Sequence, residues 1–128
     1  MNLFVCFRSV DAYEGMQVIN RLKSVSDTSL VILEEAGQNP EWKKSVSTKI
    51  ASAQFVVFLL GNTTFQSEHI KWEYKKAVAL NKTIIGIKLS GVSEASLLSL
   101  KKYSVFENVD ESLNHIMSVG NPYAKIAI

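Results

Sequence analysis

Cysteine is nearly absent from this chain of 128 residues, which contains only Cys6. A single cysteine cannot form a disulfide within the chain, so a reducing, cytoplasmic environment is expected. Histidine is almost as scarce, and the two that occur, His69 and His115, are far apart in the sequence. These residues do not form the closely spaced ligand groups of a zinc site, and no metal is expected.

Long hydrophobic runs are absent too. The run Phe55–Leu60, FVVFLL, is far shorter than the roughly 20 apolar residues that a membrane-spanning helix needs. The amino terminus has neither a basic leader nor a long apolar core, so no signal peptide is expected. We therefore expect a soluble protein without a membrane partner.

The chain also lacks an excess of one charge. Its 14 Lys and Arg residues are interleaved with 12 Asp and Glu residues, which leaves a formal net charge of +2. This balance does not favour a nucleic-acid partner. The length and the 47% hydrophobic content predict one domain, residues 1–128, that buries about two thirds of its unfolded surface.

Short apolar runs alternate with amphipathic stretches along the chain. The predicted strands are Leu3–Phe7, Ser29–Leu33, Phe55–Leu60, Thr83–Leu89 and Tyr103–Phe106. The predicted helices start at Asp11, at Asn39-Pro40-Glu41, at Ser67, at Glu94 and at Asp110, the last running to about Val119 with Gly120 beyond it. This alternation predicts an α/β protein with a parallel sheet covered on both faces, of flavodoxin-like strand order 2-1-3-4-5.

The expected order also predicts where a ligand binds. In such a sheet the cleft lies beyond the carboxyl ends of the strands, between strands one and three. The segments that reach this edge are residues 7–11, 34–38 and 61–67. A candidate site is therefore expected there.

One carboxylate lies within the apolar side of the helix that starts at Ser67. The predicted apolar stripe consists of Ile70, Tyr74, Ala77 and Val78, with Leu80 at its edge. Glu73 is about 60° from the centre of this stripe, and His69 precedes it on the same flank. Because burial of a carboxylate is costly, Glu73 is a candidate for chemistry. The alternative is a surface carboxylate paired with His69 or Lys76.

Three segments carry a resemblance to a known family: FVCFRSVDA, EWKKSVSTKIASAQFVVFLLGNTT and SEHIKWEYKKAVALNKTIIGIKL. They are similar to the TIR-like domains of bacterial and archaeal defence systems, in particular the Thoeris-type (ThsB-like) family. The resemblance covers roughly residues 3–89 and includes a Ser followed six residues later by Glu. It implies a TIR-like three-layer fold.

The resemblance also implies an activity. Family members cleave NAD⁺ at the nicotinamide–ribose bond, often with cyclisation, to make an ADP-ribose-type signal in antiviral defence. NAD⁺ is then the substrate, and no further cofactor is needed. Assembly into a homo-oligomer on activation and a downstream effector that senses the product are implied as partners.

Site residues are assigned by position in the same way. Glu73 matches the catalytic glutamate, and Ser67 matches the serine before it. The substrate-binding residues implied by the match and by the loops at the sheet edge are Phe7, Arg8, Ser9, Asp11, Gly61, Asn62, Thr63, Ser67 and His69. The amides of residues 61–63 and the hydroxyls of Thr63, Thr64 and Ser67 are expected to hold the diphosphate. The chain departs from the family where His69 replaces a common Trp and Cys6-Phe7 replaces Ser-Tyr.

Two other functions remain open at this point. One is a catalytically silent TIR-like module that acts by protein–protein association, with Trp72 on its surface. The other is a nucleoside deoxyribosyltransferase-like enzyme, which also uses a glutamate against a ribosyl centre. For single residues, the simpler interpretations are a helix cap for Ser67, a solvated strand end for Arg8 and a core position for Trp42.

Overall fold

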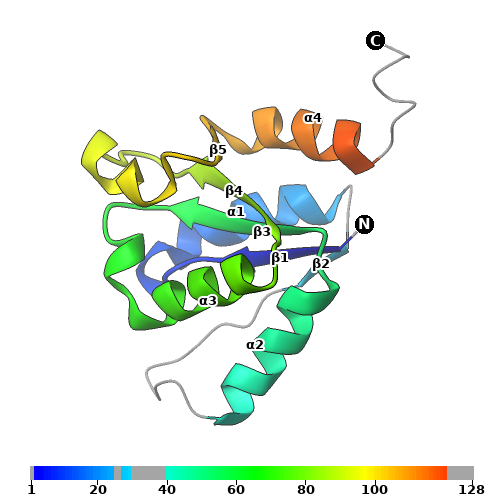
Figure 1. Cartoon of the computed structure of the whole chain (residues 1–128). Helices are drawn as coiled ribbons and strands as arrows, with labels where there is room; N and C mark the ends of the chain where they lie inside the picture. The colour runs from blue at the N-terminus through cyan, green and yellow to red at the C-terminus, as the bar shows by residue number, and fades with distance from the viewer. Residues whose placement is uncertain (1, 25–26, 30–39, 121–128) are drawn as a thin grey trace.

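The computed structural model describes residues 2–24, 27–29 and 40–120 of the chain (Figure 1). The strands are β1 Asn2–Cys6, β2 Asp27–Ser29, β3 Phe55–Leu60, β4 Thr83–Lys88 and β5 Ser104–Phe106. The α-helices are α1 Ala12–Lys23, α2 Pro40–Ser52, α3 Glu68–Ala79 and α4 Val109–Gly120. Three 3₁₀ helices, η1 Ser9–Asp11, η2 Thr64–Gln66 and η3 Glu94–Leu100, lie in the loops.

The strands form one sheet in the order β2-β1-β3-β4-β5, and each neighbouring pair is parallel. The predicted α/β class with a parallel sheet is confirmed. In the register of β1 and β3, Cys6 lies opposite Phe58. The carboxyl ends of these two strands therefore lie side by side, where the winding of the chain reverses.

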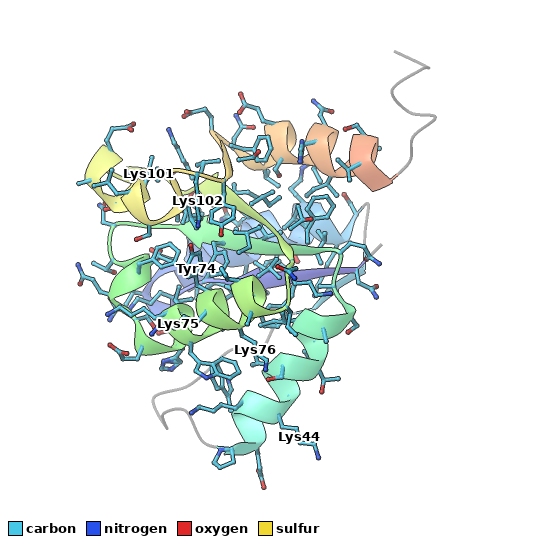
Figure 2. The ribbon with its side chains drawn as sticks, in the orientation of Figure 1. Lys44, Tyr74, Lys75, Lys76, Lys101 and Lys102 are labelled. Atoms are coloured by element: carbon cyan, nitrogen blue, oxygen red, sulfur yellow. The ribbon has the colours of Figure 1, made fainter. Side chains whose placement is uncertain are left out.

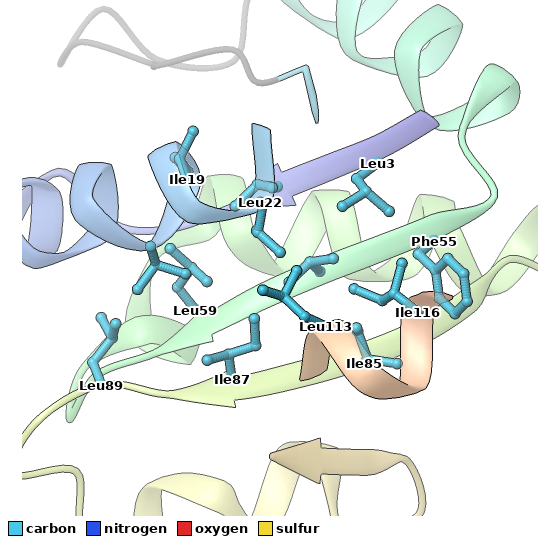
Figure 3. Close-up of a cluster of buried hydrophobic side chains, with 13 residues drawn as sticks. Leu3, Ile19, Leu22, Phe55, Leu59, Ile85, Ile87, Leu89, Leu113 and Ile116 are labelled. Carbon is cyan, nitrogen blue, oxygen red and sulfur yellow. The ribbon is translucent and has the colours of Figure 1, made fainter. Parts of the chain in front are cut away.

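Each face of the sheet is covered by helices, which explains why all six residues of β3 are buried. Helices α1 and α4 cover one face, where Leu3, Phe55, Ile85 and their neighbours form an apolar cluster (Figure 3). Helices α2 and α3 cover the other face. The apolar cluster on that face contains Phe4, Cys6, Trp42, Val46, Ile50, Ala53, Val56, Phe58, Leu60, Ile70, Ala77, Ile84 and Leu100. In the described part of the chain, no helix is long and apolar enough to cross a membrane.

Several predicted element bounds need correction. Strand β2 covers residues 27–29, so the prediction of 29–33 overlaps it at Ser29, and residues 30–39 lie outside the described part of the chain. Strand β4 ends at Lys88, one residue early, and β5 begins at Ser104, one residue late. The predicted loop 34–38 also lies among the residues that are not described.

The final helix starts earlier than predicted. The helix runs from Val109 to Gly120, so Asp110 is in its first turn instead of capping it, and Gly120 belongs to the helix. The cap is Asn108, whose Oδ1 accepts a hydrogen bond from the Glu111 amide at 3.0 Å. An Asn side chain fills the capping role as well as Asp, which is why the sequence pattern alone misplaced the start by two residues.

Candidate functional site

Glu73 is buried at the interface between α3 and the sheet, with 4% of its surface exposed. The buried residues of α3 are Ile70, Glu73 and Ala77, whereas Val78 is 42% exposed. Glu73 therefore lies inside the buried stripe, and the prediction that Val78 belongs to this stripe is wrong. The helix packs against α2 and η2, and this packing sets its rotation about its own axis.

Aromatic side chains packed between α2 and α3 help to fix the rotation of α3 about its own axis. The rings of Trp42 and Trp72 have centroids 5.2 Å apart, and the rings of Trp42 and His69 have centroids 5.7 Å apart. Trp42 is 6% exposed, which confirms its predicted core position, while Trp72 is partly buried against it. Part of the Trp72 indole is thus buried in the contact between α2 and α3.

The environment of Glu73 favours its neutral form. Burial raises the pKa of Glu73 to about 8, and the influence of the Cys6 side chain lowers it in part. Among the described residues, no Lys or Arg forms an ion pair with this carboxyl. The alternative of a surface carboxylate paired with His69 or Lys76 (Lys76 is labelled in Figure 2) is therefore wrong.

Cys6 is the residue of this site that the sequence did not reveal. It ends β1 and is 2% exposed, on the sheet face that α2 and α3 cover. Burial, with the Glu73 carboxyl as a second cause, raises the pKa of the Cys6 thiol well above its usual range, so the thiol stays protonated. The sequence did contain a signal for Cys6. Side chains alternate along β1, which places Cys6 on the same face of the sheet as Phe4.

Phe7 follows Cys6 and points to the opposite face of the sheet. It packs against the cluster under α1, where a Cβ added to Gly15 would lie 3.2 Å from Cδ2 of Phe7. Side chains alternate between the two faces of a strand, so Phe7 and Glu73 cannot share a face. Ser9 is exposed in η1. The structure does not bring these two predicted residues next to Glu73.

Arg8, Thr63 and His69 are brought together at the carboxyl edge of the sheet. Nη1 of Arg8 donates to the carbonyl oxygen of Thr63 at 3.5 Å, which links the loops after β1 and β3. Burial, followed by the positive charge of Arg8, lowers the pKa of His69. Arg8 is partly buried by these contacts, so it is more than a solvated strand end. A guanidinium and a neutral imidazole therefore lie at the same edge.

Asp11 and Gly61 meet where the loops after β1 and β3 converge. A Cβ added to Gly61 would clash with the Asp11 carboxylate, which would have to move to make room for it. Oδ2 of Asp11 is buried and has no hydrogen-bond partner among the described residues. Burial and then Glu14 raise the pKa of Asp11, while Arg8 lowers it. The site thus includes a second carboxyl group with spare hydrogen-bonding capacity.

We expect Gly61→Ala to destabilise the fold by about 1–3 kcal/mol, because the added methyl group must displace the Asp11 carboxylate. Urea unfolding of the variant and the wild-type chain measures this change. The Asp11→Ala background is the matched control, since it removes the atoms with which the methyl group clashes. An equal cost of Gly61→Ala in both backgrounds would contradict the contact.

Thr64 organises the loop after β3 from within. Its Oγ1 accepts a hydrogen bond from the Gly61 amide at 2.8 Å and lies 3.2 Å from the Leu59 carbonyl oxygen, to which it donates. Thr64 is 1% exposed. The Gly61 amide and the Thr64 hydroxyl are thus engaged within the loop, and the expected diphosphate role of these two groups is not supported.

Thr64→Val is expected to cost about 1–3 kcal/mol of stability, because the isosteric change leaves the buried Gly61 amide without its acceptor. The neighbouring change Thr63→Val is the control, expected to stay within about 0.5 kcal/mol since Thr63 is less buried. Chemical denaturation of both variants provides the comparison. Equal losses in the two variants would argue against the hydrogen bonds as the cause.

Asn62 and Ser67 lie at the two ends of the same loop. The Asn62 side chain donates to the Gly91 carbonyl oxygen at 3.2 Å and accepts from the Ser93 amide at 2.8 Å, so it ties this loop to the one after β4. Ser67 occupies the N-cap position of α3, but its hydroxyl makes no capping hydrogen bond. The predicted N-cap position of Ser67 is thus confirmed, but the expected capping hydrogen bond of its side chain is not formed. The Ser67 hydroxyl is left as a candidate substrate contact.

The fold is similar to that of several solved proteins. One is the CMP N-glycosidase BcmB of Clostridium botulinum, with TM-score 0.55 and 16% identity, covering 91% of this chain and 97% of that chain. Another is the 2-desoxiribosyltransferase from Leishmania mexicana, with TM-score 0.60, 12% identity and the same coverage. At this level of identity the likeness shows a shared fold. A search of curated proteins finds no match.

A comparison with known protein families identifies the family as well as the fold. Residues 4–94 match the Thoeris protein ThsB TIR-like domain. This range is more than half of the chain and contains the end of β1, the loops after β1 and β3, and the α3 helix with Glu73. The resemblance seen in the sequence is thereby confirmed. This chain belongs to the family of the TIR-like domain of the Thoeris protein ThsB.

Proposed function

We propose that this domain cleaves the nicotinamide–ribose bond of NAD⁺ and forms an ADP-ribose-type product, linear or cyclic, as a signal in antiviral defence. The observation that carries the proposal is Glu73, a carboxyl group on α3 that is buried against the sheet and whose pKa burial raises to about 8. This is the edge at which α/β sheets of this order bind ligands. Membership of the Thoeris family supports the assignment.

The reaction needs little from the protein besides one well-placed acid. The bond between ribose C1′ and the pyridinium nitrogen breaks, its electron pair goes to nitrogen, and neutral nicotinamide leaves. The ribose then carries an oxocarbenium-like charge that an ionised Glu73 stabilises. Attack by water gives ADP-ribose and releases a proton. Attack by a nitrogen of the adenine gives a cyclic product.

The charge state of Glu73 suits a cationic substrate. With its pKa near 8, this carboxyl is mostly neutral at pH 7. The pyridinium of NAD⁺ is a cation, and a cation brought next to a buried carboxyl favours the ionised form. Glu73 would thus acquire its charge when the substrate arrives, which matches a buried acid that forms no ion pair with a described residue.

The cluster of Arg8, Thr63 and His69 suits the other half of the substrate. A guanidinium binds phosphate oxygens through two parallel hydrogen bonds, so Arg8 is assigned to the diphosphate. Asp11, with its unpaired Oδ2, is assigned to a ribose hydroxyl group, and the Ser67 hydroxyl to a further contact. A downstream effector would then sense the released product.

A second candidate is cleavage or transfer at the N-glycosidic bond of a nucleoside or nucleotide. The observation that favours it is the fold shared with a CMP N-glycosidase and with a 2-desoxiribosyltransferase. A buried glutamate serves that chemistry as well. A neutral nucleoside, however, brings no cation to Glu73, which is why NAD⁺ is the better match for this site.

The purified chain, incubated separately with NAD⁺, a set of deoxynucleosides and CMP, tests these candidates through chromatography of the released base. Nicotinamide release supports the proposal. Turnover of deoxynucleosides or CMP without NAD⁺ cleavage would favour the second candidate function over the first. Because the family resemblance implies assembly on activation, the protein concentration should span three orders of magnitude. No release with any substrate would leave an interaction module as the function.

A further inference from the structure

A hollow lies between η3 and β5, at the edge of the sheet that β5 forms (β5 is labelled in Figure 1). Its volume is about 320 Å³, and none of the residues that line it belongs to the site around Glu73. The apolar part of its lining consists of Leu97, Leu98, Leu100, Tyr103 and Val105. The Leu98 side chain is 65% exposed. The hollow therefore presents apolar surface to solvent in the described structure.

Lysine side chains flank this hollow. Lys101 lines it, and Nζ of Lys102 lies over the ring of Tyr103, 5.4 Å from its centroid. The Tyr103 ring also packs against Tyr74 of α3, with the two centroids 6.1 Å apart. Lys75 follows Tyr74 on α3, and Figure 2 shows Lys75 below Tyr74, with Lys101 and Lys102 above it. Exposed cations from two segments of the chain thus lie beside the same hollow.

Most of these cations have no carboxylate partner. Lys88, which also lines the hollow, is the exception, since its Nζ lies 2.7 Å from Oε1 of Glu107 and 3.8 Å from Oε1 of Glu94. The three lysines of the preceding paragraph form no ion pair with any described residue. Even with both glutamates counted, this surface has an excess of positive charge.

We propose that the η3–β5 surface, formed by residues 97–105 with Lys75 and Lys88, binds a segment of a protein partner that presents an apolar side chain flanked by Asp or Glu. The apolar side chain enters the hollow, and the carboxylates face the unpaired lysines. An apolar centre with a polar, charge-complementary rim is the usual anatomy of a protein–protein interface. This inference does not depend on cleavage of NAD⁺.

Nucleic acid matches this surface less well. The chain has two arginines, of which Arg8 binds the loop after β3 and Arg21 is paired with a carboxylate of α4, so neither is free to read phosphates here. Stacking of bases needs a free aromatic face. The Tyr103 ring, however, is covered by Lys102 and packed against Tyr74. The charge and the apolar hollow together favour an acidic protein segment.

A second copy of this chain is the alternative occupant. Among the described residues, the segment 10–14 comes nearest to the required chemistry, since Val10 and Tyr13 are 69% and 86% exposed and two carboxylates accompany them. These carboxylates are engaged elsewhere. Glu14 accepts a hydrogen bond from the Ser90 amide at 2.9 Å, and Oδ2 of Asp11 is buried. A different protein is therefore the better match.

The test begins with a phage library of random peptides selected on the purified full chain. Enriched peptides should combine Asp or Glu with Leu, Ile or Phe. The most enriched peptide is then synthesised and titrated into nitrogen-15-labelled protein. The amide signals of residues 97–105 should shift, while those of His69 and Glu73 should not. Enriched peptides without an excess of acidic residues, or shifts confined to other surfaces, would overturn the inference.

Substitutions at exposed positions separate the two parts of the surface. Lys101→Glu combined with Lys102→Glu should weaken peptide binding about tenfold, because two attractions become repulsions. Leu98→Ser should weaken it about fivefold through lost apolar burial. The matched controls are Lys23→Glu on α1 and Met117→Ser on α4, which alter exposed side chains elsewhere and should stay within about twofold.

Three further outcomes decide between the occupants. Equal binding of the peptide by the double lysine variant and the wild-type chain refutes the inference. Tighter binding of a single-stranded DNA oligonucleotide to the same residues refutes it in favour of nucleic acid. A dimer in light scattering that the double lysine variant dissociates refutes it in favour of a second copy. Peptide binding and nicotinamide release are measured separately, so the failure of one does not decide the other.

Discussion

Glu73→Gln is expected to release nicotinamide from NAD⁺ about 1,000-fold more slowly than the wild-type chain. The amide has nearly the shape of the acid, but it cannot carry the negative charge that stabilises the oxocarbenium-like ribose. The loss should appear in kcat, since the charge matters most in the transition state. Chromatographic assay of both proteins at equal, high concentration measures it.

Two controls make this result specific. Glu68→Gln changes an exposed carboxylate in the first turn of the same helix and should leave the rate within about twofold. Circular dichroism and NAD⁺ binding by the Glu73→Gln protein show whether fold and site persist. A variant that retains more than a tenth of wild-type activity would remove Glu73 from the reaction.

The second large effect is on stability and its dependence on pH. In the folded chain the pKa of Glu73 is raised from its ordinary 4.5 to about 8, because the carboxyl is buried. Between these two values the unfolded chain ionises Glu73 while the folded chain keeps it protonated, so ionisation favours unfolding. The contribution of Glu73 to stability therefore falls as pH rises from about 4.5 to 8 and levels off above that.

Glu73→Gln removes this penalty. The variant should be about as stable as the wild-type chain at pH 5, and more stable by on the order of 4 kcal/mol at pH 8, since each unit of pKa difference is worth about 1.4 kcal/mol. Urea unfolding of the two proteins at pH 5, 6, 7 and 8 measures the difference, in which all other titrating groups cancel. Parallel stability curves would show that Glu73 is not buried in a neutral form.

Together, these two expected effects describe a site built at the expense of stability. The position of Glu73 would be filled by an apolar side chain if packing alone mattered, since Ile70 and Ala77 flank it on the buried stripe. A substitution that stabilises the fold and abolishes activity is the pattern expected of a functional group in a core. A substitution that stabilised the fold without loss of activity would contradict a functional role for Glu73.

Much of this fold was predictable because its strands are covered on both faces. The run Phe55–Leu60 predicts β3 with both bounds, and the Asn39-Pro40-Glu41 start predicts α2 from Pro40. Glu73 was predictable as a candidate because a carboxylate within an apolar periodicity is unusual. These features depend on neighbours along the chain, which the sequence displays directly.

The residues that surround Glu73 and the neighbouring loops were not predictable in the same way. The thiol of Cys6 meets Glu73 across 67 positions of sequence, and the Asn62 side chain reaches the loop after β4. Phe7 was expected at the cleft, yet the pleat of β1 turns it to the opposite face. Each of these outcomes depends on how helices and loops pack onto the sheet.

The amino-acid sequence alone determined the α/β class, the positions of the main strands and helices, the family, and the acid that distinguishes α3. The tertiary structure alone decided that this acid is buried, which side chain it meets, and which loop groups are already bonded to one another. The physical reason is that periodicity is a local property of the chain. Burial and the pKa of Glu73, in contrast, depend on atoms that only folding brings within a few ångströms of each other.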